Sequence, residues 1–87
     1  MIDIDAEIRA FVVERDKMLL SLDIERMKMF HAEHNPLGPP FRDDQVALVA
    51  MHKARTGARS LPICARRHSY EWLRLRGYSS FDDGDLA

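Results

Sequence analysis

The stretch that decides the fold is residues 4–34, IDAEIRAFVVERDKMLLSLDIERMKMFHAEH, which contains neither glycine nor proline. Its apolar residues recur at helical spacing and define one wide face: Ile4, Ile8, Phe11, Val12, Met18, Leu19, Leu22, Met29 and Phe30. This periodicity predicts a single amphipathic helix over residues 4–34, about 45 Å long at ~1.5 Å per residue. Asp3 or Asp5 is suited to cap its start. The alternative is a break near Ser21-Leu22-Asp23, with Ser21 capping a second helix.

A second, narrower apolar line runs roughly opposite the main face of this helix. Its residues follow steps of seven, four and three: Val13, Leu20, Ile24 and Met27. One interpretation is a helix covered on both sides by other parts of the same chain. The other is an oligomer seam for a second copy or a partner, by the a/d logic of coiled coils. Because the remaining elements are too short to cover both sides of a rod about 45 Å long, we expect a homodimer through this seam.

Downstream of residue 34, turn-forming residues divide the chain into a loop and two shorter helices. Residues 35–43 contain three prolines and Gly38 and predict a stiff connector between helices. Asp43 or Asp44 caps a helix over residues 44–56, which ends at Gly57. Ser60 caps a helix over residues 60–76, which ends at Gly77, and residues 78–87 form an acidic tail.

These elements predict one all-α domain over residues 1–87, with a long N-terminal helix packed on a C-terminal two-helix hairpin. At 87 residues and 46 % hydrophobic content the chain is a small globular protein. Its one cysteine, Cys64, excludes an internal disulfide. No apolar run approaches the roughly 20 residues of a membrane helix, and the acidic start does not resemble a signal peptide. We therefore expect a cytoplasmic protein that does not bind membranes.

Charge is strongly separated along the chain, although the formal net charge is only −1. Residues 52–76 carry seven lysines and arginines against one acid, Glu71, whereas the segments on both sides are acidic. On a helix over residues 60–76, one face is predicted to be the core: Leu61, Cys64, Ala65, His68, Trp72 and Leu75. Trp72 is expected to be its largest anchor. A basic stripe lies opposite and beside it: Arg66, Arg67, Tyr70 and Arg74.

Three interpretations of the basic stripe remain open. It is a solvated face neutralised by the chain's own acids, a docking surface for an acidic protein patch, or a nucleic-acid contact. Arginine and tyrosine often carry interface energy, which favours a protein partner. For nucleic acid, the candidate phosphate contacts outside the stripe are Lys53, Arg55 and Arg59. Residues 44–76 have the outline of a helix-turn-helix, but residues 61–64, at the start of the second helix, offer almost no hydrogen bonds to bases.

Catalytic and metal-binding patterns are mostly absent from the sequence. The glycines are isolated, and no serine, cysteine and histidine grouping has an orienting partner at a readable spacing. Cys64 and His68 are four residues apart, but zinc needs further converging ligands, so we interpret them as a core cysteine beside a partly buried histidine. We expect no cofactor, no metal and no catalytic residue.

The working hypothesis is a small non-enzymatic regulatory or interaction protein, such as an inhibitor or accessory subunit of a larger complex. It would present the basic stripe to an acidic partner. The first alternative is a nucleic-acid-binding module that uses the same stripe. The second is an orphan metal site or enzyme built on Cys64 and the histidines.

Overall fold

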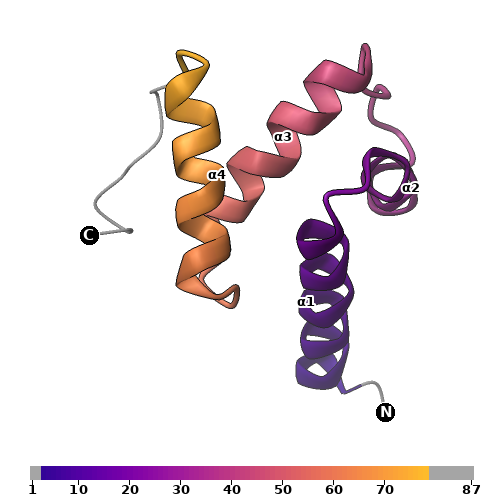
Figure 1. Ribbon diagram of the computed structural model, residues 1–87. Helices are drawn as coiled ribbons and strands as arrows, with labels where there is room; N and C mark the ends of the chain where they lie inside the picture. Colours follow the sequence, from indigo (N-terminus) through magenta and orange to yellow (C-terminus); the bar gives the residue numbers. More distant parts are fainter. Residues whose placement is uncertain (1–2, 79–87) are drawn as a thin grey trace.

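The computed structural model describes residues 3–78, which form four helices and no strand (Figure 1). The helices are α1 (Ile4–Ser21), α2 (Ile24–His34), α3 (Asp44–Gly57) and α4 (Ile63–Leu75). The all-α class is confirmed for this part of the chain, whereas one continuous helix over residues 4–34, and with it a three-helix arrangement, is wrong. The acids of the predicted tail lie outside the described residues. None of the helices between residues 3 and 78 has the length and apolar character needed to cross a bilayer.

Three consecutive residues, Ser21, Leu22 and Asp23, end α1 and start α2. Ser21 Oγ donates a hydrogen bond to the Met18 carbonyl at 2.6 Å, and Leu22 adopts a left-handed conformation with φ of 52°. Asp23 Oδ1 then accepts the N–H of Glu25 at 3.0 Å and caps α2. Ser21 therefore ends the first helix, and Asp23 rather than Ser21 starts the second. The break lets α2 run across the end of α1 instead of continuing it (Figure 1).

The α3–α4 hairpin begins at a cap that the sequence predicted. Asp43 Oδ1 accepts the Val46 N–H at 2.9 Å, and α3 ends at Gly57. The start of α4 differs from the prediction, because Pro62 occupies the N-cap position without any side-chain cap. Ser60 lies outside the helix and accepts a hydrogen bond from Arg15 Nη2 at 3.0 Å. Proline disfavours helical geometry in the residue before it, so the helix starts after Pro62 rather than at residue 60.

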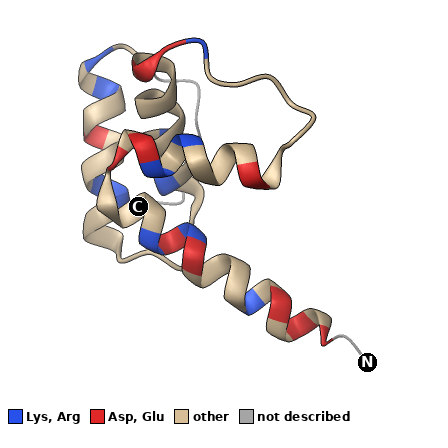
Figure 2. Ribbon diagram, turned by 90° about the vertical axis from the view of Figure 1, so that its right-hand side faces the viewer, with Lys and Arg blue, Asp and Glu red and all other residues tan. Residues whose placement is uncertain are grey.

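The core lies where α1, α2 and the turn after α3 meet α3. Its main cluster of buried residues comes from all these segments: Met18, Leu19, Met27, Met51, Ala58 and Leu61. The central position expected for α3 is confirmed, since it contacts each of the other helices (Figure 1). Only the C-terminal half of α1 reaches this cluster, and its N-terminal half projects from the body (Figure 2).

The face that α4 buries differs from the predicted core face. The buried residues are Ala65, Arg66, Ser69 and Leu73, whereas Cys64, His68 and Leu75 are exposed and Trp72 is only half-buried. Because α3 is the principal neighbour of α4, the hairpin turn decides which face is covered. Leu75, which was predicted to be buried, stays exposed because no other helix of the described chain covers the C-terminal end of α4.

Candidate interaction surfaces

The predicted basic stripe is only partly present on the surface, because Arg66 is buried with 8 % exposure. Its Nε and Nη2 donate to the Thr56 carbonyl at 3.3 and 3.1 Å. Thr56 is in the last turn of α3, where the carbonyls have no partner within the helix. Arg66 thus joins the two helices of the hairpin. The prediction that it contacts a partner is wrong, because its side chain is buried.

A revised line of side chains occupies the solvent side of α4, and we call it the α4 stripe. Its members follow helical steps of four, three and four: Ile63, Arg67, Tyr70 and Arg74. Ile63 is 47 % exposed, Arg67 and Arg74 are exposed, and Tyr70 is half-buried at the edge. The structure therefore brings three of the four predicted stripe residues together and adds an apolar one.

The charge on the α4 stripe is moderated by Glu71, which lies on the same side of the helix. Arg74 Nη2 donates to Glu71 Oε2 at 2.9 Å, and this hydrogen bond raises the pKa of Arg74 above its usual value. Both side chains are about half exposed, so the pair sits in water and remains available for exchange with another carboxylate. The stripe is a basic surface of modest strength.

Of the three candidate phosphate contacts outside the stripe, one is buried and two are exposed. Arg55 is 4 % exposed, and its Nη2 donates to the Ala65 carbonyl at 3.2 Å. Its Nε and Nη1 have no hydrogen-bond partner, and burial lowers the pKa of this guanidinium. Arg55 is therefore wrong as a phosphate contact. Lys53 and Arg59 are exposed, and Lys53 Nζ lies 5.6 Å from the centroid of the Tyr78 ring.

The predicted oligomer seam is not a continuous surface. Met27 is buried in the chain's own core, and Ile24 packs against that core. Val13 and Leu20 are about half exposed on α1, on the other side of the break. Because α2 turns away at Leu22, the four residues do not share one face in the described chain, so a continuous seam is absent there. The homodimer itself stays a prediction.

A different apolar surface is uncovered on α1, and we call it the α1 apolar face: Ile4, Ile8 and Phe11. Ile4 is 66 % exposed and Ile8 55 %, whereas Leu19 on the same face is fully buried. Phe11 marks the boundary, since its ring lies 5.5 Å from Phe30. The sequence predicts one wide apolar face along α1, but the chain covers only the part around Met18 and Leu19 and leaves the α1 apolar face exposed.

A ring stack inside the hairpin was not anticipated. His52 is 2 % exposed, its Nδ1 lies 2.9 Å from Ser69 Oγ, and its ring stacks on Trp72 with centroids 4.1 Å apart. The Arg76 guanidinium covers the Trp72 ring, also at 4.1 Å. Burial, followed by the nearby positive charge of Arg55, lowers the pKa of His52 to about 4. This histidine is a neutral structural group at neutral pH.

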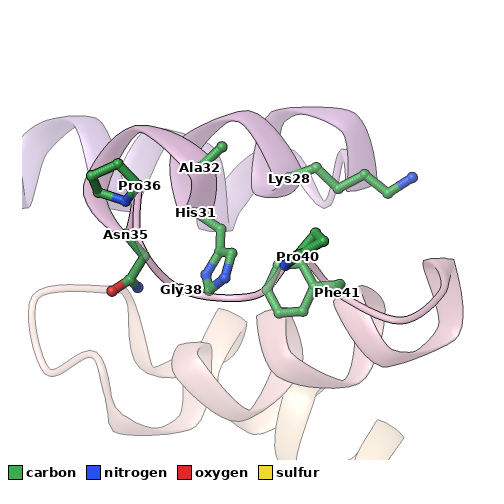
Figure 3. A pocket seen from close by; sticks show the side chains of 8 residues that line it. All are labelled: Lys28, His31, Ala32, Asn35, Pro36, Gly38, Pro40 and Phe41. Carbon is green, nitrogen blue, oxygen red and sulfur yellow. The ribbon is translucent and has the colours of Figure 1, made fainter.

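The proline-containing loop forms a shallow pocket of about 410 Å³ against α2 (Figure 3). His31 and Phe41 form its inner wall, with ring centroids 4.3 Å apart, and His31 Nε2 lies 3.1 Å from the Pro39 carbonyl oxygen. Lys28 lies at the rim but pairs with Asp44 and Glu25. The polar groups around the pocket are thus used to hold the loop in place, as expected for a connector.

The cysteine and histidine pair on α4 is exposed rather than buried, so its interpretation as a core pair is wrong. Within residues 3–78, no group of three or more histidine, cysteine or acidic side chains is arranged to hold a metal ion. Comparisons with protein-family models, with curated proteins and with solved structures gave no significant match to this chain.

Proposed function

We propose that this chain is a small non-enzymatic interaction protein that binds an acidic protein partner through the α4 stripe. The observation that carries the proposal is the exposed line of Ile63, Arg67, Tyr70 and Arg74 on the side of α4 that faces away from α3. An apolar anchor, an aromatic edge and two guanidinium groups within one helical line have the composition of interface centres.

Two features favour a protein partner over nucleic acid. Arg55 and Arg66 are buried, so the hairpin exposes fewer cations than its sequence suggests. In addition, Ile63 and Cys64 occupy the exposed first turn of α4, where a DNA-reading helix would place hydrogen-bonding side chains. An acidic protein surface with an apolar centre complements both the charge and the isoleucine.

The test is affinity isolation from the native source with three versions of the protein. Wild type and a control with Arg42→Glu should retain the same acidic protein, while Arg67→Glu with Arg74→Glu should lose it. Arg42 is a suitable control because its side chain is 83 % exposed and lies in the loop, away from α4. Retention that survives the double charge reversal would contradict the proposal.

Nuclease treatment in the same experiment distinguishes a protein partner from a nucleic-acid ligand. A protein partner should remain bound after nuclease digestion, whereas a nucleic-acid bridge should be released. If wild type instead binds purified nucleic acid with an affinity that falls steeply with salt, and Lys53→Ala lowers that slope by about one, the nucleic-acid alternative replaces the proposal.

A further inference from the structure

The chain that follows α4 complements the α4 stripe in charge. Residues 79–87, which lie outside the described residues, read SSFDDGDLA and carry three acids, no base and two large apolar side chains. The α4 stripe carries two exposed guanidinium groups, a tyrosine ring and an exposed isoleucine. An acidic segment with apolar side chains is the kind of partner that this surface fits, and the same molecule contains one.

The end of α4 turns the chain towards the side of the hairpin. Gly77 has a φ of 84°, and its N–H donates to the Arg74 carbonyl at 3.1 Å. The Tyr78 N–H donates to the Leu73 carbonyl at 2.9 Å. These two hydrogen bonds form a Schellman motif, which stops a helix and satisfies its last carbonyls. Tyr78 is thereby placed beside α3, where its ring centroid lies 5.6 Å from Lys53 Nζ.

From Tyr78, nine residues are long enough to reach both arginines of the stripe. Arg74 lies in the last turn of α4, and Arg67 is seven residues earlier, about 10 Å further along the helix axis. A helix with its side chains is about 10–12 Å wide. Nine residues in extended conformation span up to about 30 Å, which exceeds the sum of the two distances.

The stripe is not a bare surface. Arg67 and Tyr70 each take part in a polar, ring or electrostatic contact, as does Arg59 in the turn before α4. Arg74 in addition pairs with Glu71 at 2.9 Å. An acidic partner that binds here must therefore replace existing contacts, and its affinity depends on how firmly the stripe is already occupied.

We propose that residues 79–87 are an internal acidic ligand of the α4 stripe, which masks this surface until an acidic partner displaces them. The three aspartates of the segment meet Arg67 and Arg74, and its two large apolar side chains cover Tyr70 and Ile63. Each exposed ion pair contributes little, but attachment to the same chain gives the segment an effective concentration of about 1 mM. The masking role rests on the proposed function, whereas the contact itself does not.

The first experiment detects the contact in the full chain by paramagnetic broadening of nuclear magnetic resonance signals. A nitroxide is attached to Ala87→Cys in a Cys64→Ser background, which leaves one reactive thiol. The amide signals of Arg67 and Tyr70 should be broadened, whereas those of α2 should not. Asparagine in place of all three aspartates of residues 79–87, called the neutral-tail variant, should restore the α4 signals, as should high salt.

Two results of this experiment would overturn the proposal. One is broadening that is absent from α4 or is unchanged in the neutral-tail variant. The other is broadening that appears only between chains, which is read by mixing nitroxide-bearing chains without isotope label and isotope-labelled chains without nitroxide.

The second experiment measures the masking with a defined probe, a fluorescent synthetic peptide of sequence SSFDDGDLA. The peptide should bind the full-length neutral-tail variant more tightly than wild type, by the inverse of the fraction of wild-type chains whose stripe is open. If four chains in five are masked, the gain is about five-fold. Adding Arg67→Glu and Arg74→Glu to the neutral-tail variant should abolish binding, while adding Arg42→Glu in the loop should not. Equal affinity of the peptide for wild type and for the neutral-tail variant would refute the masking.

These experiments use only this chain and a peptide of its own sequence, so their failure differs from failure of the proposed function. If both fail while affinity isolation still yields an acidic protein that depends on Arg67 and Arg74, the stripe binds a partner without internal competition. If both succeed while affinity isolation yields no such protein, the internal contact stands and the proposed function falls.

Discussion

His52 should make the stability of this protein depend on pH in the mildly acidic range. The neutral ring fits its site, where Nδ1 meets Ser69 Oγ at 2.9 Å and the ring face covers Trp72. A protonated ring would be desolvated and would face the positive charges of Arg55, His68 and Arg76. The folded state therefore resists protonation of a group that the unfolded chain protonates readily.

The sign and size follow from the two pKa values. The unfolded histidine titrates near 6.5 and the folded one near 4, so the unfolded state binds more protons between these limits. The stabilising contribution of neutral His52 is complete above pH 6.5 and is lost as pH falls towards 4. The total loss is about 3 kcal/mol, at ~1.4 kcal/mol per pH unit. That is a large part of the stability of a small domain, which is about 5 kcal/mol or slightly more.

Urea unfolding at a series of pH values measures this contribution, with Trp72 fluorescence and helical circular dichroism as probes. The free energy of unfolding of wild type should fall by about 2 kcal/mol between neutral pH and about pH 5. His52→Gln should show a flatter dependence over the same range, whatever its stability at neutral pH. The comparison of slopes removes the contributions of all other titrating groups.

Two results would refute the reasoning. The first is a His52 ring signal that titrates near 6.5 in nuclear magnetic resonance spectra, assigned by its loss in His52→Gln. The second is an equal pH slope of wild type and His52→Gln. Either outcome would mean that water reaches the ring in the folded state, which its 2 % exposure does not allow.

Two pairs of substitutions test the orientation of α4 and the roles of the two buried arginines of the α3–α4 hairpin, Arg55 on α3 and Arg66 on α4. Leu73→Ala should lower the free energy of unfolding by about 3 kcal/mol because the side chain is fully buried, while Leu75→Ala, at 72 % exposure, should change it by less than ~0.5 kcal/mol; similar losses would mean that the buried face is assigned incorrectly. Arg66→Met should cost about 1–3 kcal/mol because it leaves the Thr56 carbonyl without its donor. Arg55→Met should be close to neutral or stabilising, because two of its buried nitrogens have no partner; a larger loss from Arg55→Met than from Arg66→Met, in chemical denaturation, would contradict this assignment.

Features that depend on a few neighbouring residues were predicted well. Asp3 and Asp43 cap α1 and α3 as expected, since a carboxylate can reach an N–H only two or three residues away. Gly57 ends α3, and Gly77 adopts a positive φ of 84° just after α4. The site of the helix break was also visible as an alternative at Ser21-Leu22-Asp23, although the residue that caps α2 was not.

Features that depend on distant contacts were not predicted. Arg66 has the sequence environment of an exposed arginine, yet the Thr56 carbonyl and the closeness of α3 bury it. Leu75 fits the apolar period of α4, yet no helix of the described chain reaches far enough to cover it. The spacing of Ile63 to Arg67, Tyr70 and Arg74 places these residues on one side of α4. That this side faces solvent depends on how α4 packs on α3.

By itself, the sequence determined the helical class, the caps of α1 and α3, the ends of α3 and α4 and the hairpin after residue 43, because helix formation responds to local periodicity and to side-chain hydrogen bonds close in the chain. The tertiary structure alone decided that α2 turns away at Leu22, that α4 buries Arg66 and Ser69, and that the α1 apolar face is left exposed. The physical reason is that an apolar stripe specifies a face that must be buried, but not which element buries it. In a chain with so few helices, part of that face stays exposed.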